Sequence, residues 1–263
     1  MKVNEIRFGD SLELMRELPD NCIDLTVTSP PYDNLRDYNG HVSQWSFEKF
    51  QQIAIELFRI TKLGGVVVWV VGDATINGSE TGTSFKQALY FKEMGFNLHD
   101  TMIYEKSGCS LPSPNRYLQH FEYMFVFSKG KPKTYNLICD RENRFERWGK
   151  TKKVREKDGS FTVRMTKPFS KYGRRYNIWK YTTGGQGNTT SDELAFRHPA
   201  VFPEQLAQDH IISWSNPGDI VFDPFCGSGT TAKMAVVNGR QFLGFEIDET
   251  YCALARKRVE AFL

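Results

Sequence analysis

A glycine-rich segment near the end of the chain has the residue types and spacing of a nucleotide-binding turn. Residues 227–232 read Gly-Ser-Gly-Thr-Thr-Ala, which fits G-x-G-x-x-[GA], and Glu246 follows 17 residues after Gly229. Glycines let a backbone approach a ligand closely, a helix N-terminus attracts negative charge, and an acid ending the next strand can hold ribose hydroxyls. The pattern predicts a site for an adenosine-containing cofactor. Alone, it equally fits a tight strand-to-helix turn capped by Ser228 or Thr230.

A second candidate for chemistry follows a predicted strand near the start of the chain. Residues 23–28 form an apolar, β-branched run, and the loop residues after it are Ser29, Pro30, Pro31 and Tyr32. Proline has no N–H and cannot continue a central strand, so the strand must stop here. Taken alone, a double proline predicts a strand end and nothing more.

Alternating strands and helices position these two segments. Periodicity and turn residues predict strands at 3–8, 23–28, 66–71, 98–104, 123–128, 220–223 and 242–246, and helices at 11–18, 47–61, 84–94, 203–214, 230–238 and 249–262. Gly64 and Gly65 are expected to end the second helix. The alternation indicates an α/β fold. Residues 218–263 are too few to bury a sheet alone, so their strands are expected to join the N-terminal ones.

A basic, aromatic stretch interrupts this alternation. Residues 131–180 contain 16 Lys and Arg against 5 Asp and Glu, a local net charge of +11 in a chain whose total is +3. Aromatic side chains such as Phe161 and Trp179 are interleaved with these charges, which suits phosphate contact and base stacking, although a basic run is also typical of a solvated face. We therefore divide the chain into 1–130, a basic nucleic-acid-binding region at 131–195, and 196–263, with the outer segments forming one domain.

Composition excludes several other classes of protein. The five cysteines are odd in number and form no C-x-x-C pair, which favours reduced thiols over disulfides or a zinc site. His120 and Glu122 match half of a zinc deaminase signature, but the P-C-x-x-C half is absent, so no metal is expected. The apolar runs fall far short of the roughly 20 residues that span a bilayer. The N-terminus has no signal-peptide pattern, so we expect a cytoplasmic protein without a membrane partner.

Two motifs together resemble those of a known family. Residues 221–231 (Val-Phe-Asp-Pro-Phe-Cys-Gly-Ser-Gly-Thr-Thr) resemble the cofactor motif of amino-group DNA methyltransferases, and residues 28–32 (Thr-Ser-Pro-Pro-Tyr) resemble their catalytic motif. Having the catalytic motif first, a basic region next and the cofactor motif last is the circularly permuted order of the family's β class. The resemblance covers nearly the whole chain outside 131–195. It implies a circularly permuted Rossmann-like methyltransferase sheet, an inserted target-recognition region, and S-adenosylmethionine as cofactor.

The resemblance also implies roles for residues at the cofactor site. Glu246 would take the ribose hydroxyls, and Asp10 matches the acid that contacts the adenine amino group, although Asp10 also fits a helix N-cap with Glu13 three residues on. Phe202 and Pro203 are expected to close over the ligand. The cofactor's methionine part and carboxylate would lie among Asp223, Phe225, Gly227, Ser228, Gly229, Thr230 and Thr231.

The implied chemistry is methyl transfer to an exocyclic amine. Hydrogen-bond acceptors that hold the amine hydrogens out of plane return the lone pair to nitrogen, and Ser29 Oγ and the Pro30 carbonyl are the expected acceptors. Pro31 stiffens the loop, and Tyr32 offers a face for the flipped base. Carbon-5 methylation needs a thiol, family-typically in a Pro-Cys pair, and the sequence has no such pair.

The expected substrate is double-stranded DNA with base flipping. Ser29, where many adenine-N6 enzymes have Asp, favours N4 of cytosine, and N6 of adenine stays open. A nicotinamide-dependent oxidoreductase and a non-catalytic DNA-binding module are the rival hypotheses. A cognate restriction endonuclease is a possible partner of this monomer or homodimer. The residues expected to bind DNA are Arg147, Lys150, Lys152, Lys153, Arg155, Lys171, Arg174 and Arg175.

Overall fold

The computed structural model describes residues 1–31, 45–108, 115–143, 151–165, 170–182, 189–190 and 192–263. These residues form two compact units, one made of 1–136 with 177–263 and the other of 137–176. Within the described residues, every helix is too short or too polar to span a lipid bilayer.

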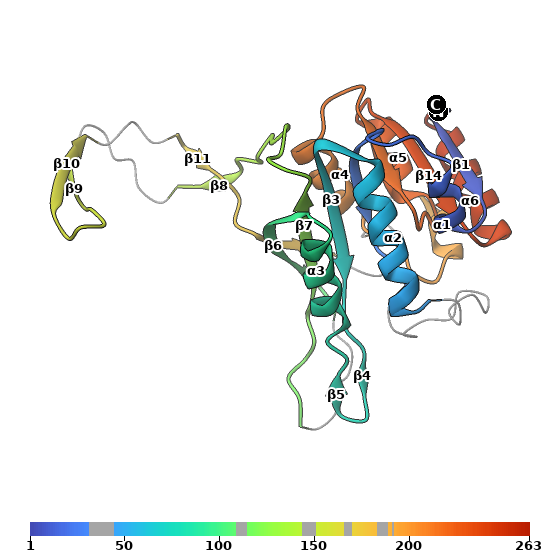
Figure 1. Cartoon of the computed structure of the whole chain (residues 1–263), viewed down its shortest axis with the longest axis horizontal. Helices are drawn as coiled ribbons and strands as arrows, with labels where there is room; N and C mark the ends of the chain where they lie inside the picture. Colours follow the sequence, from blue (N-terminus) through green and yellow to red (C-terminus); the bar gives the residue numbers. More distant parts are fainter. Residues whose placement is uncertain (32–44, 109–114, 144–150, 166–169, 183–188, 191) are drawn as a thin grey trace. The chain divides into compact units, whose positions relative to one another are not determined.

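The larger unit is built on one mixed sheet (Figure 1). Its strand order is β1-β14-β13-β2-β3-β7-β6-β12. Neighbours pair in parallel except that β7 runs antiparallel to both β3 and β6. The strands are β1 (Glu5–Phe8), β2 (Ile23–Thr28), β3 (Thr61–Val71), β6 (Asn97–Lys106), β7 (Phe121–Ser128), β12 (Ile178–Tyr181), β13 (Ile220–Asp223) and β14 (Gln241–Glu246).

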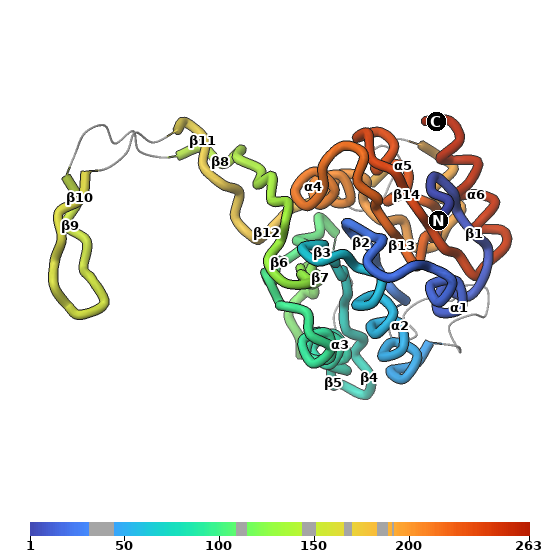
Figure 2. The backbone as a smooth tube through the Cα atoms, turned by 45° about the horizontal axis from the view of Figure 1, so that its top comes forward, coloured from blue at the N-terminus to red at the C-terminus, as the bar shows by residue number. Residues whose placement is uncertain are grey.

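The two ends of the chain complete one another in this sheet. Strand β13 pairs with β2, with Val221 opposite Leu25, and β14 pairs with β1 (Figure 2). The expectation that the C-terminal strands join the N-terminal ones is thus confirmed, as is the α/β fold class. The catalytic and cofactor motifs, almost 200 residues apart in sequence, therefore follow neighbouring strands.

Helices cover both faces of the sheet. Side chains of α1, α2 and α3 share one apolar cluster with Val67 and Trp69 of β3, while α4 and α5 lie across the sheet from α2 and α3 (Figure 2). The Ser46 hydroxyl, which accepts from the Lys49 N–H at 3.1 Å, caps α2. The helices are α1 (Ser11–Arg16), α2 (Phe47–Ile60), α3 (Thr83–Glu93), α4 (Glu204–Trp214), α5 (Thr230–Val237), α6 (Glu249–Glu260) and the 3-10 helix η2 (Glu193–Arg197).

Two local predictions were wrong or incomplete. Helix α2 ends at Ile60 and β3 starts at once at Thr61, so Gly64 and Gly65 do not end the helix. Gly64 instead has a positive φ of 83° where a Cβ would lie 2.8 Å from the Lys133 Cβ, so close chain passage requires the glycine. The hairpin of β4 (Thr75–Ile76) and β5 (Ser79–Glu80) was missed, although Asn-Gly at its turn is a hairpin signal.

The smaller unit consists of short antiparallel pairs. Strand β8 (Arg141–Glu142) pairs with β11 (Tyr172–Gly173), and β9 (Thr151–Arg155) pairs with β10 (Phe161–Met165). This unit lies within the predicted recognition region, whose extent of 131–195 stays a prediction.

Strand β12 also falls within that predicted region but belongs to the large sheet. Trp179 is only 7% exposed and stacks on His210 with ring centroids 4.7 Å apart. Inward residues alternate with outward ones along this edge strand, and Trp179 points inward. Trp179 is therefore a core residue, and its interpretation as a base-stacking side chain was wrong.

Candidate active site

The proposed site residues follow the carboxyl ends of adjacent parallel strands. Phe8 at the end of β1 is opposite Glu246 at the end of β14, and Asp223 ends β13 beside it. Ser29 follows β2, the next strand in the sheet. Ligands of open α/β sheets bind at this edge, so the topology brings the predicted catalytic and cofactor residues to one place.

The glycine turn is shaped by close packing on two sides. Gly227 and Gly229 have positive φ angles of 50° and 81°. A Cβ on Gly227 would lie 3.0 Å from His198 Nε2, and one on Gly229 would lie 3.0 Å from the Ala255 Cβ of α6. Both backbone conformation and space therefore require glycine, and α5 begins directly after the turn with its N–H groups unpaired by helix geometry.

Glu246 holds the turn through backbone hydrogen bonds. Its Oε2 accepts from the Gly227 N–H at 2.7 Å and its Oε1 from the Asp248 N–H at 2.9 Å. Burial raises the pKa of this carboxyl, an effect that the two N–H donors oppose. A carboxylate oxygen has two lone pairs, so each oxygen of Glu246 can still accept from a ribose hydroxyl.

Asp223 connects the cofactor strand to the catalytic strand. Its Oδ1 accepts from Thr28 Oγ1 at 2.6 Å and from the Phe225 N–H at 3.0 Å. Burial raises the pKa of Asp223 to about 6, despite these hydrogen bonds. Thr28 directly precedes Ser29, so one hydrogen bond joins the two motifs. Sequence reasoning gave Thr28 no role of its own, because only the pairing of β2 with β13 reveals the contact.

Asp10 has the capping role that the sequence left open. It accepts from the N–H groups of Leu12 at 2.9 Å and Glu13 at 3.3 Å at the start of α1. Lys49 Nζ lies 2.9 Å from each of its carboxylate oxygens. Burial opposes ionisation, but Lys49 and the two N–H donors lower the pKa of Asp10. Contact with an adenine amino group stays a prediction for this residue.

The Ser-Pro-Pro segment leaves the sheet where the sequence predicted. Strand β2 ends at Thr28, Ser29 and Pro31 are half-buried, and Pro30 is buried. Tyr32 lies outside the described residues. Phe225 packs edge-on against Trp45, with ring centroids 5.3 Å apart, and so gives the site an aromatic wall.

The hydroxyls of the cofactor motif have partners in two other elements. Thr231 Oγ1 donates to the Val27 carbonyl of β2 at 3.1 Å. Ser228 Oγ and Thr230 Oγ1 accept from the Arg258 guanidinium of α6. Arg258 was missed, although its position on the buried stripe of the last helix was a signal.

The segment before α4 lies beside the glycine turn. His198, which is close to Gly227, packs edge-on against Tyr251 with ring centroids 4.5 Å apart. Phe202 is half-buried and Pro203 is the N-cap of α4. Closure of Phe202 and Pro203 over a ligand stays a prediction.

The basic residues predicted to bind DNA gather in the smaller unit. Lys152, Lys153 and Arg155 lie on β9, whereas Arg147 and Lys150 lie outside the described residues. Lys171 and Arg174 flank β11. Arg175 Nε lies 2.9 Å from Asp140 Oδ2, and this ion pair, against a small opposing effect of burial, lowers the pKa of Asp140. The positive charge of Arg175 is thereby partly compensated.

The residues at the sheet edge fit S-adenosylmethionine. The turn requires glycine at two positions, Glu246 retains lone pairs for a ribose, and the N-terminus of α5 suits a carboxylate. Asp223 is a buried carboxylate to which a positively charged amine or sulfonium is complementary.

Comparisons with known proteins identify the family. The family model described as DNA methylase matches residues 23–257. The chain is 59% identical over 254 residues to the orphan methyltransferase M.BamHII of Bacillus amyloliquefaciens, covering 95% of this chain and 93% of that protein. It is 25% identical over 263 residues to the DNA adenine methyltransferase YhdJ of Escherichia coli strain K12, covering 96% and 81%.

Solved structures agree with this assignment. TTHA0409 of Thermus thermophilus, described as a DNA modification methylase and solved with S-adenosyl-L-methionine, has a TM-score of 0.64 at 25% identity and covers 98% of this chain and 95% of its own. The cytosine-N4-specific PvuII DNA methyltransferase shares the fold, with a TM-score of 0.69 at 20% identity, covering 100% and 92%. These findings replace the oxidoreductase alternative. The chain belongs to the DNA methylase family and is an S-adenosylmethionine-dependent DNA methyltransferase.

Proposed function

We propose that this enzyme methylates N4 of cytosine in duplex DNA. The observation that carries the proposal is the position of Ser29, directly after Thr28, whose hydroxyl donates to Asp223 of the cofactor motif at 2.6 Å. This bond ties the start of the catalytic loop to the strand that leads into the glycine turn. A serine at this position, where many adenine-N6 enzymes of the resembled family have Asp, favours cytosine.

The proposed chemistry depends on acceptors at the start of the loop. An exocyclic amine is a poor nucleophile because its lone pair is delocalised into the ring. Ser29 Oγ and the Pro30 carbonyl would accept the two amine hydrogens and hold them out of plane, and this geometry matters most in the transition state. Pro30 and Pro31 contribute no N–H that competes for these acceptors. Bound S-adenosylmethionine supplies the electrophilic methyl group on its sulfonium.

The target amine must leave the stacked duplex to reach this loop. Enzymes that act on a base extrude it into a pocket, and aromatic faces then stack on it. We assign this stacking role to Tyr32.

The β9–β10 hairpin is the element that we assign to reading the DNA. A two-stranded β-ribbon fits the major groove, which is about 12 Å wide. The register puts Lys153 opposite Val163 and Arg155 opposite Phe161 on one face. Val163 and Phe161 are 61% and 64% exposed, and neither Lys153 nor Arg155 has an acidic partner among the described residues. This face combines uncompensated positive charge with exposed apolar side chains.

The opposite face of the hairpin differs in charge. Here Arg164 lies opposite Lys152, and Arg164 Nη2 forms an ion pair with Glu156 Oε1 at 2.7 Å. Glu156 also accepts from Thr162 on this face. A carboxylate repels the DNA backbone, so the face with Lys153 and Arg155 is the one that we turn toward phosphates and bases.

The chemical identity of the methylated nucleoside tests the proposed target base. Random-sequence duplex is incubated with the enzyme and S-adenosylmethionine, hydrolysed to nucleosides, and separated by liquid chromatography with mass detection. We expect N4-methylcytosine. N6-methyladenine as the product would replace the proposal by the alternative for which the adenine-modifying relative YhdJ is a precedent.

A further inference from the structure

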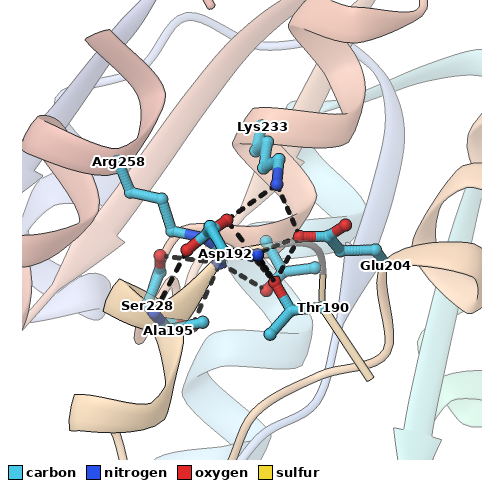
Figure 3. Close-up of polar contacts among 8 residues, drawn as sticks. Thr190, Asp192, Ala195, Glu204, Ser228, Lys233 and Arg258 are labelled. Atoms are coloured by element: carbon cyan, nitrogen blue, oxygen red, sulfur yellow. Dashed lines mark hydrogen bonds and ion pairs between the residues drawn. The ribbon is translucent and has the colours of Figure 1, made fainter. Parts of the chain in front are cut away.

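A buried cluster of four charged side chains lies behind the cofactor turn. Lys233 Nζ lies 2.7 Å from Asp192 Oδ2 and 2.6 Å from Glu204 Oε1. Arg258 lies 2.8 Å from the same Asp192 oxygen through Nε and 2.6 Å from Glu204 through Nη2 (Figure 3). The Lys233 and Arg258 side chains are 2% and 0% exposed. Two cations against two carboxylates make the cluster formally neutral, as burial requires.

Arg258 also reaches the cofactor turn itself. Its Nη1 donates to the Ser228 carbonyl at 3.0 Å, to Ser228 Oγ at 3.3 Å and to Thr230 Oγ1 at 2.8 Å (Figure 3). The same helix touches the turn a second time, because Ala255 is the residue that a Cβ on Gly229 would meet. One guanidinium thus connects the neutral cluster to two hydroxyls of the cofactor motif.

The direction of these hydrogen bonds has a chemical consequence. Arginine has five N–H donors and no acceptor, so a hydroxyl bonded to it can only accept. Each hydroxyl keeps its own proton, and neither Ser228 nor Thr230 has a further side-chain hydrogen-bond partner among the described residues. Both protons are therefore left to donate to an anion at the N-terminus of α5.

We propose that Arg258 is a positioning residue that fixes the Ser228 and Thr230 hydroxyls as donors to the cofactor's methionine carboxylate. The two carboxylates Asp192 and Glu204 hold the guanidinium in place, and Lys233 balances their charge. The inference rests on the proposed contacts of Ser228 and Thr230 with the cofactor, and it is independent of the target base.

The test compares two ligands that differ at the carboxylate. S-adenosylhomocysteine contains the amino-acid carboxylate, whereas 5′-methylthioadenosine keeps the adenosine and the sulfur but lacks the amino-acid part. Isothermal titration gives both affinities for the wild type and for Arg258→Met. We expect the variant to bind S-adenosylhomocysteine about 10- to 100-fold more weakly, the range for hydrogen bonds to a charged group, and to bind methylthioadenosine within about twofold of the wild type.

Three further variants separate positioning from folding. Arg256→Met changes an arginine of the same helix that donates to the Ile6 carbonyl instead, and it should leave both affinities unchanged. Arg258→Met combined with Asp192→Asn restores charge balance around Lys233 but not the contacts with the turn, so the selective loss should persist in a folded protein. Arg258→Lys keeps the charge, but one ammonium cannot replace the fork, and it should recover only part of the affinity.

Two outcomes would overturn the proposal. One is a folded double variant, shown by its circular dichroism spectrum and cooperative unfolding, that loses affinity equally for both ligands or for neither. The other is a wild type that binds both ligands equally, because the carboxylate would then contribute nothing. Neither result concerns the methylated base, so the assignment to cytosine N4 stands or fails separately.

Discussion

The cations of the larger unit and those of the smaller unit have opposite surroundings. Arg258 and Lys233 are fully buried and face the carboxylates of Asp192 and Glu204. Lys153 and Arg155 are on a hairpin face that is exposed throughout and has no acidic partner among the described residues. The first pair stabilises the cofactor site from within the protein, and the second is free to contact phosphates. Local net charge pointed to the smaller unit and gave no sign of the buried cluster, so the role of a basic residue follows from its neighbours.

Stability should separate the two kinds of cation most strongly. Arg258→Met leaves an uncompensated negative charge in the buried cluster and should lower the free energy of unfolding by about 3–5 kcal/mol. Lys153→Met, at an exposed site, should change it by less than about 0.5 kcal/mol. Urea unfolding near neutral pH measures both. Equal destabilisation by the two substitutions would remove the distinction between the units.

The buried carboxylate of Asp223 should make stability depend on pH. Burial raises its pKa from 3.8 to about 6, so the folded protein binds the proton more tightly than the unfolded chain. The ionised form therefore costs up to about 3 kcal/mol of stability above pH 6, and this cost fades as the pH falls toward about 4. Asp223→Asn keeps an acceptor for Thr28 and should be more stable than the wild type at about pH 7.5 but not at about pH 4.

Urea unfolding of the two proteins at both pH values checks this expectation. A difference in unfolding free energy that does not vary with pH would show that Asp223 does not titrate in this range. The variant should also bind S-adenosylmethionine more weakly, because a buried negative charge that complements the cofactor has been removed.

The two faces of the hairpin should differ in DNA binding, with a smaller effect. Lys153→Ala should weaken duplex binding by about 3- to 10-fold and reduce the slope of log affinity against log salt by about 1. Lys152→Ala is the matched control on the face that carries Glu156, and it should leave the slope unchanged. Fluorescence anisotropy over a salt series measures both. A larger change from Lys152 than from Lys153 would mean that the other face meets the DNA.

The sequence predicted the fold and the outline of the site well because their signals are local. Strand β2 ends at the double proline, and the glycine turn follows β13, each within a few residues of a motif. The pairing of β13 with β2 followed from the need of a short C-terminal unit to complete a sheet.

The buried cluster could not be predicted in this way. Its members come from the segment before η2, the start of α4, helix α5 and the end of α6, and no local pattern relates them. A partial signal did exist in the last helix, where Tyr251, Ala255 and Arg258 share one buried stripe. An arginine at such a position needs an internal partner, which indicates a buried ion pair but does not identify it.

The single-turnover rate of methyl transfer by Ser29→Ala tests the proposed chemistry most directly. Enzyme with prebound S-adenosylmethionine is mixed with saturating duplex, and the methylated base is quantified against time. Loss of one acceptor that acts in the transition state should slow the chemical step by about 100- to 1,000-fold, while the affinities for cofactor and DNA stay within about twofold. A rate equal to that of the wild type would contradict a catalytic role for Ser29 at the end of β2.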